Sequence, residues 1–159
     1  MKKIALLTNI LVLYIMALIA CGKSETLKPI RDLSSFKFSA NDSALSYPIN
    51  LAYIQDAGTI HTTLITGTYP DTSSKQGSIS IRVISDTTGH FKGDSILVTY
   101  TDQKGVIYYN THDSSNFVQI DKFTKTATGI VSGSFYCRVA NPKDTLLFSK
   151  GVFTAFYQN

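Results

Sequence analysis

The feature that most constrains this chain is the two-residue alternation of apolar and polar side chains in its longer segments. It is clearest from Ser78 to Ile84, where Ile79, Ile81 and Val83 alternate with polar side chains. This period places the apolar side chains of an extended segment on one face, which is typical of a half-buried strand. No segment after Ala20 keeps the apolar spacing of an amphipathic helix. The sequence therefore predicts an all-β domain.

Segments rich in β-branched and aromatic residues are predicted as strands. They are Phe36–Ala40, Ile49–Ile54, Ile60–Tyr69, Ser78–Ile84, Ser95–Thr101, Val106–Tyr109, Phe117–Phe123, Ile130–Val139 and Thr145–Tyr157. We expect an antiparallel sandwich or a flattened barrel of about eight or nine strands. Both architectures stay open at this point.

The segments between the predicted strands have the composition of turns. Asp102 to Gly105 predicts a tight hairpin in which the glycine supplies a positive φ. Asn141 to Asp144 predicts a type I turn with Pro142 at its second position. Phe148 and Phe153 differ in parity, so they cannot both face inward unless the last strand contains a bulge near Lys150.

The first 20 residues have the pattern of a secretion signal. Lys2 and Lys3 precede an apolar stretch from Ile4 to Ala20, interrupted only by Thr8 and Asn9. A short basic segment followed by such a stretch at the N-terminus favours a signal peptide. An uncleaved membrane anchor is the alternative, because about 17 apolar residues can just span a bilayer.

The segment Leu18-Ile19-Ala20-Cys21 resembles the bacterial lipobox: a branched apolar residue, a tolerant position, a small residue and a cysteine. The resemblance implies acylation of Cys21 and cleavage after Ala20. Several acyl chains would fix the protein to a membrane, because each buried CH₂ contributes about 0.8 kcal/mol. The expected location is therefore the cell envelope, on the outer membrane, facing either the periplasm or the cell surface.

The predicted organisation is a signal peptide (1–20), a lipidated N-terminus with a flexible tether (21–35) and one all-β domain (36–159). The tether is polar, contains Pro29 and shows no regular period. The chain has 159 residues and a formal charge of +4, of which Lys2 and Lys3 leave with the signal. The small, evenly spread remaining charge argues against nucleic acid as a partner.

Cys137 is the second of the two cysteines. If Cys21 is acylated, no internal disulfide can form. Gly133, Phe135, Cys137 and Val139 share one parity of a predicted strand. We therefore expect the Cys137 thiol to be a buried, small, apolar group.

The polar residues give no catalytic or metal constellation. Asp86, His90 and Asp94 would share a helix face, but the glycines around them predict a solvated loop instead of a metal site. The run from Asn110 to Asn116 contains His112, Asp113 and Ser114 side by side. A catalytic triad is assembled across a fold rather than from neighbours, so this run is predicted to be a polar hairpin loop. No cofactor is expected.

Tyrosines offer a possible binding surface. Tyr108, Tyr109, Tyr136 and Tyr157 include outward strand positions that could stack against a sugar or a peptide. The alternative is that these rings pack against cross-strand neighbours.

The C-terminal third resembles a known family. Phe117-Val118-Gln119-Ile120, Ile130-Val131-Ser132-Gly133-Ser134-Phe135 and Gly151-Val152-Phe153 are similar to the closing motifs of a domain-of-unknown-function family of Bacteroidota lipoproteins. Cys137 replaces the second aromatic residue of the family's pattern. The resemblance supports attachment to the cell envelope as a lipoprotein and supports the β fold, and it implies no particular activity.

The resemblance also implies possible O-glycosylation, because Bacteroidota envelope proteins carry O-glycans at Asp followed by Ser or Thr and a small apolar residue or Thr. Asp42-Ser43-Ala44 and Asp86-Thr87-Thr88 fit this pattern within expected loops. Ser43 and Thr87 are therefore the predicted acceptors.

The leading functional hypothesis is a non-enzymatic, lipid-anchored envelope protein, attached to the membrane through Cys21, whose domain binds another protein or a glycan. The second is a small-ligand carrier with a calycin-like barrel. The third is an envelope hydrolase. An internal cavity would favour the carrier, an exposed apolar patch or sheet edge the binding module, and convergent carboxylates with perturbed pKa values the enzyme.

Overall fold

The computed structural model describes residues 34–69, 77–126 and 128–158. The predicted signal peptide, the lipobox-like segment and residues 21–33 of the tether lie outside these ranges. The described chain consists of strands with one short 3-10 turn, which confirms the all-β prediction. The elements are β1 (Ser35–Ala40), β2 (Ser43–Tyr47), β3 (Ile49–Ala57), β4 (Ile60–Thr68), β5 (Ser78–Val83), β6 (Gly89–Lys92), η2 (Gly93–Ser95), β7 (Ile96–Thr101), β8 (Ile107–Asn110), β9 (Phe117–Phe123), β10 (Ile130–Ala140) and β11 (Thr145–Gln158).

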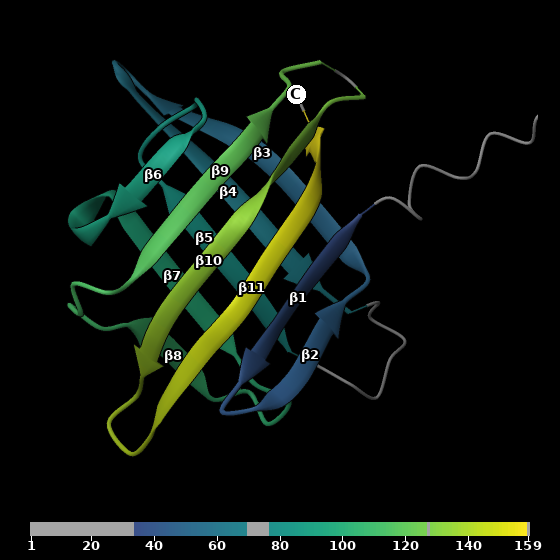
Figure 1. The fold of residues 1–159 in the computed structure, drawn as a ribbon. Coiled ribbons are helices and arrows are strands. Elements are labelled where there is room, and N and C mark those ends of the chain that lie inside the picture. Colours follow the sequence, from purple (N-terminus) through teal and green to yellow (C-terminus); the bar gives the residue numbers. More distant parts are fainter. Residues whose placement is uncertain (1–33, 70–76, 127, 159) are drawn as a thin grey trace, which may run out of the picture.

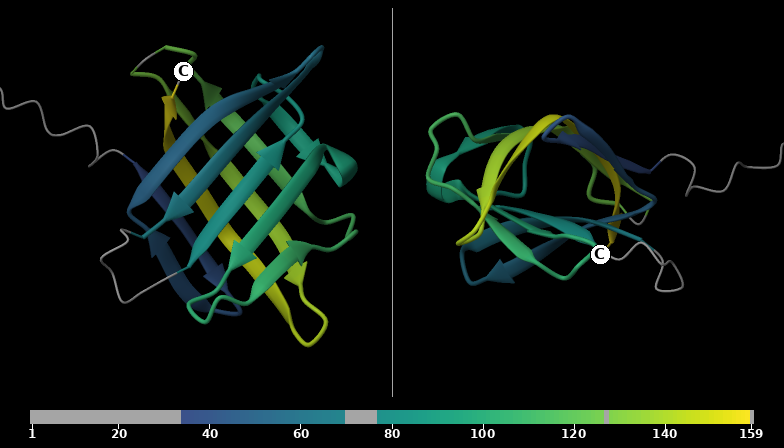
Figure 2. Two further views of the ribbon diagram at one scale, coloured as in Figure 1. Left: turned by 180° about the vertical axis from the view of Figure 1, so that it is seen from behind. Right: turned by 90° about the horizontal axis from the view of Figure 1, so that it is seen from below.

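All strands belong to one sheet, in the order β2-β1-β11-β3-β4-β5-β7-β8-β10-β9-β6, and β10 also pairs with β11. This additional pairing closes β11, β3, β4, β5, β7, β8 and β10 into a ring. The end-on view in Figure 2 shows that the ring is flattened. We call β2, β1, β11, β10, β9 and β6 the front layer, most of which faces the viewer in Figure 1, and β3, β4, β5, β7 and β8 the back layer.

The two longest strands join the layers. β11 has 14 residues, and its last three pair in parallel with Leu51 to Tyr53 of β3. The last two residues of β10 pair with Tyr109 and Asn110 of β8. All other strand pairs of the described chain are antiparallel. The predicted fold class is confirmed, with the parallel β3–β11 pair as the addition that closes the ring.

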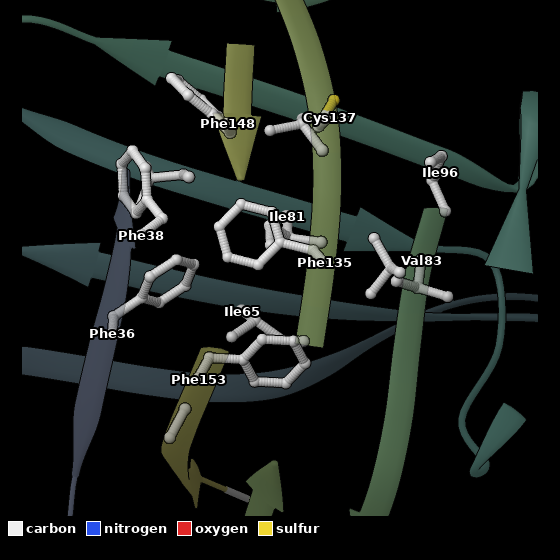
Figure 3. Packing of buried hydrophobic residues seen from close by; sticks show 14 of the residues in the cluster. Phe36, Phe38, Ile65, Ile81, Val83, Ile96, Phe135, Cys137, Phe148 and Phe153 are labelled. Atoms are coloured by element: carbon white, nitrogen blue, oxygen red, sulfur yellow. The ribbon is translucent and has the colours of Figure 1, made fainter. Parts of the chain in front are cut away.

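The alternation of side chains produces one apolar core between the two layers. In this core, phenylalanine rings of the front layer meet β-branched side chains of the back layer (Figure 3). These rings are Phe36, Phe38, Phe135, Phe148 and Phe153, and the β-branched side chains are Ile65, Ile79, Ile81, Val83 and Val98. Each is at most 3% exposed. The front layer also buries aliphatic side chains such as Val118 and Val131, and the back layer also buries Tyr100 and Tyr108. Interlocking shapes of this kind fill an interior to crystal-like density.

A bulge in β11 confirms the prediction made from Phe148 and Phe153. The pairing shifts by one residue opposite both β1 and β10, and both phenylalanines are buried. Lys150 supplies the bulge with a positive φ of 53°. At Gly151, an added Cβ would lie 2.5 Å from the Phe135 ring, so only glycine fits beneath that ring.

Cys137 lies on the core face of β10, as predicted. Its side chain is fully buried, and the structure leaves it as a free thiol. Burial raises the pKa of this thiol to about 12, because the thiolate would lose its hydration inside the core. The thiol is therefore an inert packing group.

The nine predicted strands are all present, with boundaries shifted by at most three residues. The turn at Asp102 is present as predicted: Gly105 has a φ of 80°, and its amide donates to the Asp102 carbonyl at 3.1 Å. The chain also reverses between Asn141 and Asp144, but there the amide of Asn141 donates to the Asp144 carbonyl at 2.9 Å, the opposite direction to the bond of the predicted type I turn. Two strands were missed, β2 and β6, which form the two edges of the sheet. Both are short, and neither carries a long alternating pattern.

Two residue assignments change with these edge strands. Ser43 was predicted in a loop, but it begins β2 and pairs with Ala40 across a two-residue turn. Both turn residues, Asn41 and Asp42, have positive φ values, the signature of a type I′ hairpin. His90 was also expected in a loop and instead lies in β6, paired with Gln119 of β9.

Candidate functional site

The predicted lipidation site, Cys21, and the lipobox positions Leu18, Ile19 and Ala20 lie outside the described residues. The predicted glycan acceptors are described. Ser43 is exposed at the start of β2. Thr87 is exposed in the loop between β5 and β6, where its hydroxyl lies 3.1 Å from that of Ser85. Their modification stays a prediction, which intact-mass measurement of the protein from its native envelope can test.

Three rings form a row on the outer face of the front layer. Phe117 of β9 pairs directly with Tyr136 of β10, and their rings are nearly parallel, with centroids 6.3 Å apart and planes 10° apart. His90 of β6 continues the row at 5.0 Å from Phe117. The phenylalanine and tyrosine are half-buried, and the histidine is exposed. We call His90, Phe117 and Tyr136 the aromatic row.

The other tyrosines named above do not belong to this surface. Tyr108 and Tyr157 are each only 6% exposed, so they are core residues. Tyr109 is 53% exposed, but it lies on the outer face of the back layer. Burial in the core explains Tyr108 and Tyr157. Tyr136 packs against its cross-strand neighbour Phe117, as the alternative predicted, and it is the one tyrosine of the four in the row of rings.

A polar pocket of about 310 Å³ adjoins the aromatic row. We call it the loop pocket, because η2 and the loop between β8 and β9 form it. Its lining residues are Gly93, Asp94, Asn110, Thr111, His112, Asp113, Ser114 and Asn116. The pocket and the row are neighbours along the chain, since Asn116 immediately precedes Phe117.

Buried hydrogen bonds hold the loop of this pocket. Asn116 is only 2% exposed; its amide nitrogen donates to the Thr111 carbonyl at 2.7 Å, and its amide oxygen accepts from the Arg138 backbone at 2.8 Å. Satisfying both ends of a buried amide fixes the loop. These hydrogen bonds therefore fix the shape of the loop pocket.

Asp113 is occupied by structural contacts. One carboxylate oxygen accepts hydrogen bonds from the hydroxyl and the backbone amide of Ser115, at 2.7 and 2.9 Å. The other pairs with Arg138 at 3.1 Å. The hydrogen bonds from Ser115, more than the arginine, lower the pKa of Asp113. The neighbouring His112, Asp113 and Ser114 are thus not joined as a triad, which agrees with the prediction of a polar loop.

A second pocket, of about 260 Å³, lies where β3, β4 and β11 end. We call it the charged pocket; it is lined by Ile54, Asp56, His61, Asp86, Lys125, Tyr157 and Gln158. His61 contacts Asp56 at 2.6 Å, and Lys125 pairs with Asp86 at 2.6 Å. These partners raise the pKa of His61 and lower the pKa of Asp86. The charges of this pocket are therefore already neutralised within the protein.

The described residues contain no helix long and apolar enough to cross a membrane, and no cluster of three or more His, Cys, Asp or Glu placed to hold a metal ion.

Comparison with known proteins gives no relative. No protein-family model matches the chain, and neither the curated proteins nor the solved structures yield a significant match.

The aromatic row was missed at the sequence level apart from Tyr136. Its members come from three strands, and no local pattern in the chain joins them. Only the pairing of β6 with β9 and of β9 with β10 brings them together.

Proposed function

We propose that this chain is a lipid-anchored protein of the bacterial envelope whose β domain binds a partner through the aromatic row and the loop pocket. Two features support the location in the cell envelope: the lipobox-like segment and the resemblance of the C-terminal third to Bacteroidota lipoproteins. The partner is a glycan or another protein, and the lipid on Cys21 would keep the domain at the outer membrane.

The single observation that carries the binding function is the aromatic row itself. Phe117 and Tyr136 are large rings on the outer face of a layer whose core already contains five buried phenylalanines. Aromatic rings with an apolar body and a polar rim are efficient recognition groups. A rigid, hydrogen-bonded polar pocket beside such rings supplies the directional contacts that a binding site needs.

The carrier hypothesis has less support in this fold. A carrier needs an enclosed cavity, but the space between the layers is occupied by the aromatic and β-branched side chains of the core (Figure 3). The hydrolase hypothesis would have to use the charged pocket. There His61 is 48% and Asp56 63% exposed, so neither side chain sits in the water-excluded setting that strengthens catalytic electrostatics.

Two measurements test the proposal. A Cys21→Ser variant should accumulate as an unprocessed, larger precursor without bound acyl chains; normal processing would refute the lipid anchor. For binding, the mature lipoprotein in detergent micelles is tested against immobilised polysaccharides and envelope proteins. The double variant Phe117→Leu, Tyr136→Leu should lose at least tenfold in affinity, about 1.4 kcal/mol.

The matched control is Tyr109→Leu, which removes an exposed ring from the back layer. It should leave the affinity unchanged. If both variants bind like the unaltered protein, the aromatic row is not the binding site.

A further inference from the structure

The charged residues of the strands are divided unequally between the two layers. The front layer carries five basic residues and one acid: Lys37, Lys92, Lys122, Arg138, Lys150 and Asp121. The back layer carries one basic residue, Arg82, and one acid, Asp56. Arg138 is paired with Asp113 of the neighbouring loop at 3.1 Å, but the other four basic residues still give the layer with the aromatic row an excess of positive charge over its one strand acid.

Strand register places a lysine beside the row. Lys92 of β6 is the direct cross-strand partner of Phe117, so the two side chains leave the same face of the sheet. Directly opposed side chains have Cβ atoms roughly 5 Å apart. Lys92 is exposed. An ammonium group thus stands next to the central ring of the aromatic row.

Polar side chains continue from the row across the same face. Gln119 pairs with His90 on one side and with Ser134 on the other, and its amide oxygen lies 3.1 Å from the His90 ring. Val152 and Lys37 follow in register on β11 and β1. The same face therefore carries rings, hydrogen-bonding groups, the exposed side chain of Val152 and a second cation on β1.

We propose that the front layer binds an acidic oligosaccharide, with sugar rings against Phe117 and Tyr136 and carboxylate groups paired with the cations led by Lys92. This inference rests on the proposed function and names the chemistry of its ligand. Sugar rings have an apolar face that packs on aromatic side chains, and hydroxyl edges that suit Gln119 and the loop pocket. Carboxylates on the sugar complement the charge of this layer.

An anionic membrane surface is the main competitor, because a lipid anchor would hold the domain near one. Attraction to such a surface depends on basic residues alone and is screened by salt. It would not use parallel, half-buried rings flanked by hydrogen-bonding side chains. The stacked arrangement therefore favours a sugar over a lipid surface.

The experiment uses the mature lipoprotein in detergent micelles, with polygalacturonate as the acidic probe, dextran as the neutral polysaccharide and dextran sulfate as a purely charged one. Phosphatidylglycerol vesicles, with the protein exchanged into them at low occupancy, report docking on lipid. The variants are Phe117→Leu, which keeps an apolar side chain without a ring, and Lys92→Gln, which keeps the length without the charge. Arg82→Gln, on the back layer, is the matched charge control.

We expect polygalacturonate to bind more tightly than dextran. Its affinity should fall about fivefold in Phe117→Leu and about threefold in Lys92→Gln, and should be unchanged in Arg82→Gln. Binding should weaken in high salt without disappearing, because stacking is not screened. Together these results would establish an acidic sugar site.

Three outcomes would overturn the inference. Equal binding of dextran and polygalacturonate, sensitive to Phe117 but not to Lys92, would leave the proposed binding function intact and remove the acidic ligand. Binding of dextran sulfate or vesicles that depends on Lys92 but not on Phe117 would show attraction by charge alone. If replacing Phe117 changes the affinity for none of the probes and for none of the protein partners, the proposed binding function is wrong as well.

Discussion

The front and back layers share an inner architecture and differ on the outside. Both bury alternate side chains, yet the outer face of the back layer is made mostly of hydroxyl and aliphatic side chains. Thr66, Ser80 and Thr99, for example, lie opposite one another on β4, β5 and β7. Such pairs stabilise neighbouring strands without attracting a charged partner. The front layer instead carries the aromatic row and five of the six basic residues of the strands, although Tyr109 and Arg82 are exposed on the back layer.

The difference shows that the inner faces of the strands determine the fold, whereas the proposed binding groups lie on the outer faces of the same strands. Inner faces must match each other across the core, so Phe135 and Ile81 are constrained by their neighbours. Outer faces are free of that constraint, and the row of adjacent rings and most of the basic side chains of the strands lie on one layer. A surface selected solely for solubility would spread its charges over both layers.

The inner faces can be compared by removing one side chain from each. Phe135→Ala should lower the free energy of unfolding by about 4 kcal/mol and Ile81→Ala by about 3 kcal/mol. The ring is larger, and it packs against Phe36 and Phe38 with centroids 5.5 and 5.7 Å away. Denaturant unfolding followed by far-UV circular dichroism measures both. A larger loss of unfolding free energy for Ile81→Ala would mean that the β-branched side chains of the back layer stabilise the core more than the rings of the front layer do.

A buried amide distinguishes the inner face of the back layer. Asn50 of β3 is 2% exposed, and neither polar atom of its side chain has a hydrogen-bond partner among the described residues. Such groups cost about 1–3 kcal/mol. Asn50→Leu, which has the same branching with two larger methyl groups in place of the polar atoms, should therefore raise the midpoint of thermal unfolding, and Asn50→Asp should lower it. A lower midpoint for Asn50→Leu would mean that the amide has a partner in solution.

The smallest expected effect on stability comes from the charged pocket, where a loop of the front layer meets the back layer. Hydrogen bonding to Asp56 raises the pKa of His61. The contact between His61 and Asp56 therefore stabilises the fold in full below the ordinary histidine pKa of about 6.5. This stabilisation is lost as the pH rises through the raised pKa of His61. The opposite holds for Asp86, whose lowered pKa means that its pairing with Lys125 is lost only as pH falls through that value.

Proton NMR titration of the His61 ring measures this pKa. Asp56→Asn should return it toward the ordinary histidine value, and Asp113→Asn, in the loop pocket, should leave it unchanged. An unaltered His61 titration in Asp56→Asn would show that the contact is not formed in solution.

The sequence predicted the strands well, because a two-residue period records which side chains face the core. Even the bulge at Lys150 followed from the parity of Phe148 and Phe153. The edge strands β2 and β6 were missed, since an edge strand is short and has a neighbour on one side only. Ser43 and His90 were consequently assigned to loops.

The candidate site was largely beyond prediction for a different reason. Tyr136, Phe117 and His90 belong to strands that are not consecutive in the chain, and the register between such strands depends on the whole sheet. The division of charge between the layers is hidden in the same way, because lysines at scattered positions share a layer only after the ring has closed.

The closure of that ring by β11 also determines when the domain can form. The last strand lies between β1 and β10, and its end pairs residue 156 with residue 51. Contacts between such distant parts of a chain are formed slowly, since a long loop must be closed first. A chain that leaves the ribosome with its N-terminus first cannot complete the boundary between β11 and β3 until residue 158 has been made, whereas the boundary between β8 and β10 needs residues up to 140 only. We therefore expect the ring to close only after residue 158 has left the ribosome, late in the folding of this domain.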